Sequence, residues 1–203
     1  MVKPALNVGM GKTASHALEV SSASRLCIGL YGPLVQKRYG TLVAGDEKEV
    51  LSGFLDHYRK TILEICEGLS EEQLRRPMVP SGTTLLGMIH HLVYVERGWF
   101  EEGVAGLSVE YPFDEDDPEA DFRVPPDINA GDVFDLYRRQ CARSRQILAG
   151  ARLDDLIKGE ERTADYNVRW VVVHMIEETA RHAGHADILR ELIDGTTGAG
   201  YVP

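Results

Sequence analysis

Cysteine is scarce in this chain, and its spacing excludes two kinds of site. The three cysteines, Cys27, Cys66 and Cys141, are far apart and odd in number. That pattern fits neither a disulfide framework nor a zinc site of the Cys-x-x-Cys type. Disulfides are rare in reducing compartments, so the lack of a disulfide pattern leads us to expect a cytoplasmic protein. The cysteines also lie on separate segments, so the sequence singles out none of them as a nucleophile.

Long apolar runs and an excess of positive charge are absent too. A membrane-spanning helix needs about 18 or more consecutive apolar residues, and no run in the sequence approaches that length. The N-terminus lacks the basic start and apolar run of a signal peptide. The net charge is -10 at pH 7, which argues against binding to nucleic acid or to anionic membranes. We therefore expect neither nucleic acid nor a membrane as a partner.

The N-terminal part lacks a legible helical or strand pattern. Residues 9–13 (Gly-Met-Gly-Lys-Thr) superficially resemble a phosphate-binding loop. That motif requires a glycine five positions before Gly11, where the sequence has Leu6, and it also requires a preceding strand. We therefore treat residues 1–44 as an extension, either a mobile arm or a segment packed on the domain or on a partner subunit.

Helical periodicity follows this extension in four long segments. Apolar residues spaced three and four apart indicate helices over about 46–68, 81–102, 130–149 and 167–194, the second of them opened by residues 81–84. Asp46 with Glu49 predicts a capped start for the first helix, and Gly195 predicts a stop for the last. Long polar connections over 104–129 and 153–166 join the later helices. With no convincing strand, the sequence predicts an all-α four-helix bundle with long crossover loops over 45–196, and a short tail over 197–203.

The last predicted helix carries polar side chains on its apolar face. At about 100° per residue, four of them fall within one arc of about 80°: His174, Glu178, His182 and His185. Burying such groups is costly unless something satisfies them, and imidazole and carboxylate are natural ligands of a divalent metal ion. Glu178 and His182, one turn apart, are the best-placed pair to share an ion. His185 and His174 are alternative ligands or supporting side chains.

A metal site in a bundle also needs donors from a facing helix. The second predicted helix offers His90, His91 and Glu96. His91 borders an apolar face. His90 lies about 100° from His91, on the side away from that face, and is expected to face solvent. His91 is therefore the inward candidate. Glu96 is predicted either to support the site or to form an ion pair.

Two blocks of the sequence resemble a known family. Residues 84–100 (Thr-Leu-Leu-Gly-Met-Ile-His-His-Leu-Val-Tyr-Val-Glu-Arg-Gly-Trp-Phe) resemble the second-helix signature of the DinB/YfiT-like metalloenzyme superfamily. Residues 170–187 (Trp-Val-Val-Val-His-Met-Ile-Glu-Glu-Thr-Ala-Arg-His-Ala-Gly-His-Ala-Asp) resemble its last-helix signature. The resemblance covers about residues 44–195. It points to a homodimer, which apolar residues on more than one side of the bundle helices also allow.

Within the superfamily, the chain resembles the branch that includes mycothiol-dependent maleylpyruvate isomerase. Most relatives have His-x-x-x-His in the last helix, but here Glu178 stands four positions before His182. That matches the His/Glu/His zinc site of this branch. The resemblance therefore implies that His91, Glu178 and His182 hold a divalent metal, zinc first, with nickel, manganese or iron as alternatives. His185 stands where many relatives have glutamine, which implies a supporting role. The resemblance does not extend to the isomerase's additional domain, so its substrate is not carried over.

Three functions are compatible with these residues. The first is a metal-dependent enzyme in which a low-molecular-weight thiol of mycothiol type attacks a small electrophile, giving S-transfer or isomerisation. In it, His185, Glu96 or His174 would orient a ligand or relay a proton. The acidic connection over 110–122 would either cover the site or form a solvated crossover. The second is a hydrolase in which the same metal activates water. The third is a non-enzymatic module used for metal binding or dimerisation.

Overall fold

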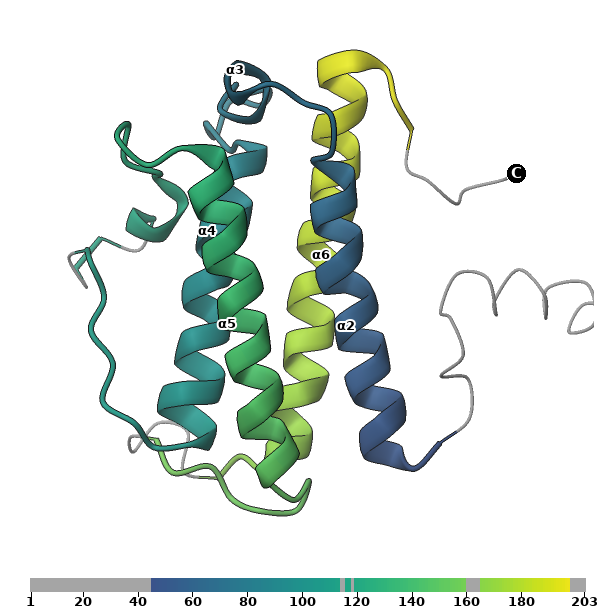
Figure 1. Ribbon diagram of the computed structural model, residues 1–203, viewed down its shortest axis with the longest axis vertical. Helices are drawn as coiled ribbons and strands as arrows, with labels where there is room; N and C mark the ends of the chain where they lie inside the picture. Colours follow the sequence, from purple (N-terminus) through teal and green to yellow (C-terminus); the bar gives the residue numbers. More distant parts are fainter. Residues whose placement is uncertain (1–44, 114–115, 118, 160–164, 198–203) are drawn as a thin grey trace, which may run out of the picture. The chain divides into compact units, whose positions relative to one another are not determined.

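The computed structural model describes residues 45–113, 116–117, 119–159 and 165–197. In this part of the chain the structure is all-α, as predicted, and its only β-type pairing is a single bridge between Leu156 and Asn167. The long helices are α2 (Glu47–Ile65), α4 (Leu85–Glu96), α5 (Ala130–Gly150) and α6 (Val168–Asp194), and they lie alongside one another (Figure 1). The shorter ones are α3 (Glu71–Leu74), the π-helix η1 (Arg97–Val104) and the 3-10 helix η2 (Ala120–Phe122). The predicted N-terminal extension and the tail beyond residue 197 lie outside the described residues.

Side-chain caps set where the helices begin. The carboxylate of Asp46 accepts a hydrogen bond from the backbone N of Glu49 at 2.9 Å, and the Glu49 side chain accepts one from the backbone N of Asp46 at 3.1 Å. This reciprocal pair is the predicted capping box of α2. The other long helices also start at a capping side chain: Thr84 for α4, Asn129 for α5 and Asn167 for α6. Gly195 ends α6 at φ 79°, a left-handed conformation that glycine adopts without strain.

The long helices run in two parallel pairs. At the start of α6, Arg169 binds Glu47 at the start of α2 (2.7 Å). At the other end, Arg190 donates to the carbonyl of Ile65, where α2 ends (2.6 Å). Helices α4 and α5 also point the same way in Figure 1. The connection from η1 to α5 must therefore run back along the bundle, which explains why it is long.

The second predicted helix is not α-helical to its end. The sequence predicts a helix to about residue 102, and the chain is helical through Val104, but from Arg97 onward it forms the π-helix η1. The predicted extent is therefore confirmed, whereas the α-helical periodicity does not hold for the last part of this helix. Gly98 and Gly103 weaken the α-helix in this segment, and π-turns are rare and often occur near functional sites.

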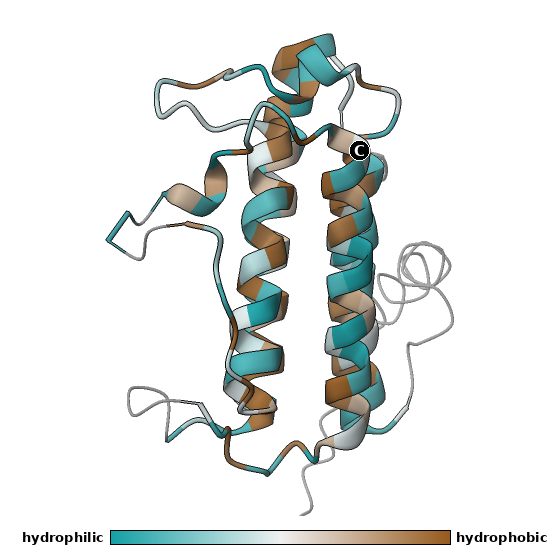
Figure 2. Cartoon of the chain, turned by 60° about the vertical axis from the view of Figure 1, so that its left-hand side comes forward, coloured by the Kyte–Doolittle hydropathy of each residue, from teal (hydrophilic) through white to brown (hydrophobic). Residues whose placement is uncertain are grey.

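Apolar side chains fill the bundle in two clusters. The first includes Ile89, Leu92 and Tyr137, and the second includes Phe100 and Met175. All five are 0% exposed, and burying one large apolar side chain contributes about 1.5–3 kcal/mol. Figure 2 shows the matching bands of hydrophobic and hydrophilic residues along the helices. The polar part of α6 that holds the candidate ligands lies next to this core.

Candidate metal centre

Three of the predicted ligands come together between α4 and α6. Nε2 of His91, on α4, lies 3.5 Å from Oε1 of Glu178, on α6. Nε2 of His182, one turn further along α6, lies 3.0 Å from the same oxygen. One candidate ligand atom from each residue lies within 4.8 Å of the others. The three side chains are 14, 15 and 11% exposed, so the group is largely buried but remains reachable from solvent.

This donor set fits a divalent metal ion. Nitrogen and oxygen ligands bind zinc at about 2.0–2.2 Å, so neighbouring ligands in a tetrahedron lie roughly 3.3–3.6 Å apart. The separations of 3.0 and 3.5 Å around Glu178 are close to that range. Two imidazoles and one carboxylate leave a fourth position open, which is typical of catalytic zinc sites and not of closed structural ones.

The surroundings favour the protonation states that a metal ligand needs. Burial alone would raise the pKa of the Glu178 carboxyl, but the neighbouring His182 and His91 outweigh it and hold that pKa below its ordinary value. Burial lowers the pKa of His182, and the charge of His91 lowers it further, although Glu178 opposes both. Near neutral pH, Glu178 is therefore ionised and His182 is neutral.

The end of the long connection covers the other side of His91. Nδ1 of His91 lies 2.7 Å from Oδ2 of Asp121, which belongs to η2. The ring of Phe122 stacks on the His91 ring, with centroids 4.0 Å apart and planes 13° from parallel. Of the two roles considered for the connection, a solvated crossover or a cover for the site, the contacts of its described end with His91 match the second. Neither Asp121 nor Phe122 was predicted as a site residue, because no periodicity marks positions within a loop.

The prediction that His90 faces solvent is wrong. His90 is only 4% exposed, and its Nδ1 donates a hydrogen bond to the backbone carbonyl of Asp121 at 2.6 Å. Its ring also packs edge-on against Tyr94. A helical projection assumes that solvent surrounds the helix, whereas here η2 covers this side of α4. Burial lowers the pKa of His90, opposed by its hydrogen bond to Asp121.

The two alternative histidines of α6 lie beside the group of three. The ring of His185 is 5.9 Å from that of His182, and the residue is exposed. His174 lies further toward the start of α6, where it stacks on Trp170 with ring centroids 5.0 Å apart. The structure therefore brings His185 near the candidate ligands without including it, and it places His174 in a separate aromatic cluster.

Glu96 points away from these ligands into the bundle. It is 0% exposed, and both carboxylate oxygens accept hydrogen bonds from Arg59 of α2, at 2.7 and 2.6 Å. Of the two predicted roles, this geometry matches the ion pair. The sequence does contain a sign of this ion pair. Arg59 occupies an apolar position of its helix, one turn from both Leu55 and Ile62, and a charge at such a position needs a buried partner.

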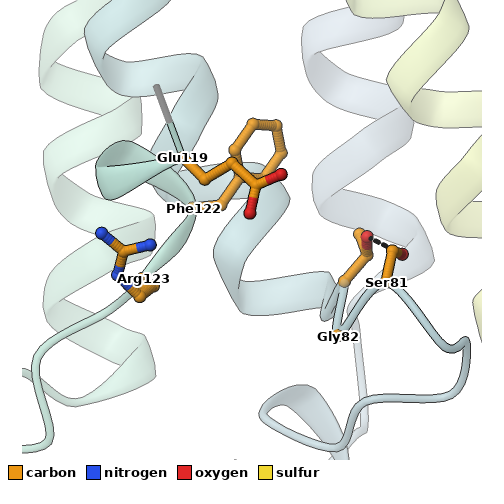
Figure 3. Close-up of a pocket in the computed structure, with 6 residues that line it drawn as sticks. Ser81, Gly82, Glu119, Phe122 and Arg123 are labelled. Atoms are coloured by element: carbon orange, nitrogen blue, oxygen red, sulfur yellow. Dashed lines mark hydrogen bonds between the residues drawn. The ribbon is translucent and has the colours of Figure 1, made fainter. Parts of the chain in front are cut away.

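A hollow lies beside Phe122, the residue that stacks on His91. It has a volume of about 370 Å³, and Figure 3 shows Glu119 and Phe122 on one wall and Ser81 with Gly82 on the facing wall. The hydroxyl groups of Ser81 and Thr83 lie 2.8 Å apart. The hollow has both polar and apolar lining, and the three candidate ligands are not among the residues that line it.

The thiols of the described residues are not suited to catalysis. Burial raises the pKa of Cys66 to about 12. Burial and the nearby Glu96 raise the pKa of Cys141 to about 12 as well. Neither side chain is a thiolate near neutral pH, so neither is poised to act as a nucleophile. Cys27 lies outside the described residues.

The fold and the sequence together define a protein of the DinB/YfiT-like class. More narrowly, the sequence model of the mycothiol-S-transferase family matches residues 50–195, and the chain belongs to that family. A crystal structure of a conserved protein from Enterococcus faecalis is similar in fold, with a TM-score of 0.56 at 16% sequence identity. The similarity covers 75% of this chain and 100% of that one. No curated protein matches the chain. Among the described helices, none is both long and apolar enough to cross a membrane.

Proposed function

We propose that this protein is a divalent-metal-dependent S-transferase that uses a low-molecular-weight thiol of mycothiol type. His91, Glu178 and His182 would hold the ion, with zinc as the first candidate and nickel, manganese or iron as alternatives. The observation that carries the proposal is the convergence of these three side chains in a member of the mycothiol-S-transferase family.

The residues of the site suit this chemistry. A divalent ion lowers the pKa of a coordinated thiol enough to deprotonate it near neutral pH. Glu178 is ionised and His182 neutral, so both can act as ligands without first losing a proton. Phe122 shields one face of His91 from water. The chain offers no reactive thiol of its own among the described residues, which is consistent with a sulfur nucleophile supplied by a small molecule.

The overall reaction balances without a redox partner. The sulfur of the thiol forms a bond to the electrophilic carbon, the thiol proton passes to solvent, and a leaving group departs with its electron pair. In an isomerisation, the new carbon–sulfur bond would break again and return the thiol. The hollow beside Phe122 lies within the range of small-molecule sites, about 300–1,000 Å³. Its hydroxyl and charged lining suits the hydroxyl-rich part of such a thiol.

The direct test compares metal-free and zinc-loaded protein in the presence of mycothiol and the electrophile monochlorobimane. We expect conjugation above the uncatalysed rate only with the loaded protein, and loss of that rate in His91→Ala. Bacillithiol serves as a second thiol and shows whether the enzyme is selective.

Two results would contradict the proposal. One is the absence of both turnover and binding heat with either thiol in zinc-loaded protein. The other is metal-dependent cleavage of ester, amide or phosphoester substrates without any thiol turnover, which would assign the same ligands to water activation.

A further inference from the structure

We propose that Asp121 is a positioning residue for the candidate ligand His91. In this role it fixes which ring nitrogen of His91 faces the other two ligands. The inference rests on the proposed metal site, but it concerns the state of His91 before any metal or thiol binds. By this inference, the long connection between η1 and α5 supplies the residue that orients His91.

The first argument is the hydrogen bond itself. Nδ1 of His91 lies 2.7 Å from Oδ2 of Asp121, whereas Nε2 lies 3.5 Å from Oε1 of Glu178. A carboxylate accepts hydrogen bonds, so the shorter contact places the imidazole proton on Nδ1. The lone pair of Nε2 then faces Glu178 and His182. Metal-bound histidines commonly donate their second ring N–H to a carboxylate in this way, which fixes the tautomer and the ring orientation.

The second argument is that the segment holding Asp121 is docked on α4 at several points. The backbone carbonyl of Asp121 accepts a hydrogen bond from Nδ1 of His90 at 2.6 Å, and Phe122 stacks on His91. At Gly87, one turn before His91, a Cβ atom would lie only 2.4 Å from the carbonyl oxygen of Phe122. Glycine at this position therefore lets the backbone of η2 approach α4 closely enough for Asp121 to reach His91.

The third argument is the contrast between the two histidines. Within the described residues, Nδ1 of His182 is buried without a hydrogen-bond partner, whereas Nδ1 of His91 has the Asp121 carboxylate. The other oxygen of that carboxylate, Oδ1, is itself buried and unpartnered in the same part of the chain. The hydrogen bonding of the Asp121 side chain is therefore directed at His91.

The test uses Asp121→Ala and Asp121→Asn, with Asp127→Asn as the matched control. Asp127 is an exposed carboxylate of the same connection. Circular dichroism and thermal melting first establish that each variant is folded. Asp121→Asn keeps an acceptor oxygen without the charge, so it should fall between the wild type and Asp121→Ala in both measurements below.

The first measurement is the nitrogen NMR spectrum of the histidine rings in metal-free protein, recorded at about pH 8.5, where an ordinary imidazole is neutral. We expect His91 to carry its proton on Nδ1 in the wild type and in Asp127→Asn. In Asp121→Ala, the population should move toward the Nε2-protonated tautomer. An unchanged tautomer in Asp121→Ala overturns the proposal, and this readout does not depend on whether the protein is a transferase.

The second measurement is zinc affinity, obtained by competition with a chromophoric chelator. Loss of such an orienting carboxylate typically weakens metal binding about 10–100-fold, and we expect a loss in that range for Asp121→Ala and none for Asp127→Asn. Equal affinity in wild type and Asp121→Ala would overturn the positioning role. Zinc binding without thiol turnover would contradict only the proposed function, because the change in tautomer and in affinity would still stand.

Discussion

Glu178 is the residue on which the candidate site depends most. Both histidines approach its Oε1, His91 from α4 and His182 from α6, the helix that also carries Glu178. A carboxylate here brings one negative charge to a group that otherwise contains two imidazoles. The neighbouring rings hold the pKa of Glu178 low despite its burial, so this charge is present over the physiological pH range.

The buried histidines predict how the stability of the metal-free protein depends on pH. The pKa values of His182 and His90 lie below the ordinary value of 6.5. Between those lowered values and 6.5, the unfolded chain binds more protons than the folded one, so acid favours unfolding. We expect the free energy of unfolding, measured by urea titration, to fall as the pH decreases below about 6.5. His182→Gln should flatten part of this decrease, and stability that stays constant or rises from about pH 7 to about pH 5.5 would contradict the account.

At the residue scale, the sequence predicts side chains on helices better than side chains on loops. The spacing of Glu178 and His182 follows directly from the pitch of a helix, and His91 from the apolar margin of its helix. Asp121 could not be predicted, because several acidic residues of the same connection were equivalent in sequence. Its position depends on how η2 docks on α4, as does the burial of His90.

At the scale of helices, α4 is tied to its neighbours by polar as well as apolar contacts. Its last residue, Glu96, forms the buried ion pair with Arg59 of α2. Burial alone would lower the pKa of the Arg59 guanidinium, but Glu96 outweighs it and raises that pKa. Because both partners are almost fully buried, water cannot replace either one. Without Glu96, the Arg59 guanidinium would keep its contact with the partly exposed Asp56 (2.8 Å) but lose its buried counter-charge.

Breaking this pair should therefore destabilise the bundle without removing the metal site. We expect Glu96→Gln to lower the free energy of unfolding by about 3–5 kcal/mol, as is usual when a buried charge loses its partner. The double variant Arg59→Met with Glu96→Leu should recover most of that loss. Denaturant titration and zinc binding are measured on the same samples. If Glu96→Gln kept its stability but lost transferase activity, Glu96 would be catalytic, which is the other role predicted for it.

The docking of η2 on α4 predicts opposite effects for two glycine substitutions. A Cβ at Gly87 would meet the carbonyl oxygen of Phe122, whereas a Cβ at Gly184 of α6 has no neighbour within 4 Å. Gly184→Ala should raise the free energy of unfolding by roughly 0.5–1 kcal/mol, the usual helix preference of alanine. Gly87→Ala should displace η2, lower stability and weaken zinc binding. Equal gains in stability for both variants would show that η2 does not depend on close approach at Gly87.

Helix starts could be predicted at this scale, but a change of helix type could not. The cap at Asp46 and the stop at Gly195 are local signals, and the structure confirms both. The π-helix η1 replaces the expected α-helical turns after Glu96. Its apolar spacing also fits an α-helix approximately, so the sequence offers no pattern that separates the two.

For the whole molecule, periodicity predicts the all-α class but not the order in which the helices pack. The parallel pairs, α2 with α6 and α4 with α5, follow from contacts between residues far apart in the sequence, such as Arg169 with Glu47. The length of the connection between η1 and α5 is the sequence feature that reflects this topology. The sequence predicts this connection as a long crossover. It also contains Asp121, whose carboxylate contacts His91.

The homodimer expected from the sequence remains a prediction, and α6 offers a face for it. Four exposed apolar side chains of α6 fall within one arc of about 100°: Trp170, Val173, Ile188 and Leu192, which are 39, 49, 57 and 51% exposed. We expect a dimer by size-exclusion chromatography with light scattering, and a shift toward monomer for Ile188→Glu with Leu192→Lys. Arg139→Glu, a charge change at an exposed position of α5, is the control. A wild-type protein that is monomeric at micromolar concentration would contradict this prediction.

The central claim is that His91, Glu178 and His182 bind a divalent metal ion. The most direct measurement is elemental analysis of the purified protein alongside Glu178→Ala, with Glu177→Ala as the control. Glu177 is the exposed neighbour that pairs with Arg181. We expect about one equivalent of zinc, or of another divalent metal, per chain in the wild type and in Glu177→Ala. Glu178→Ala should be folded and largely free of metal. A folded wild type without metal, or a Glu178→Ala variant that retains all of it, would contradict the claim.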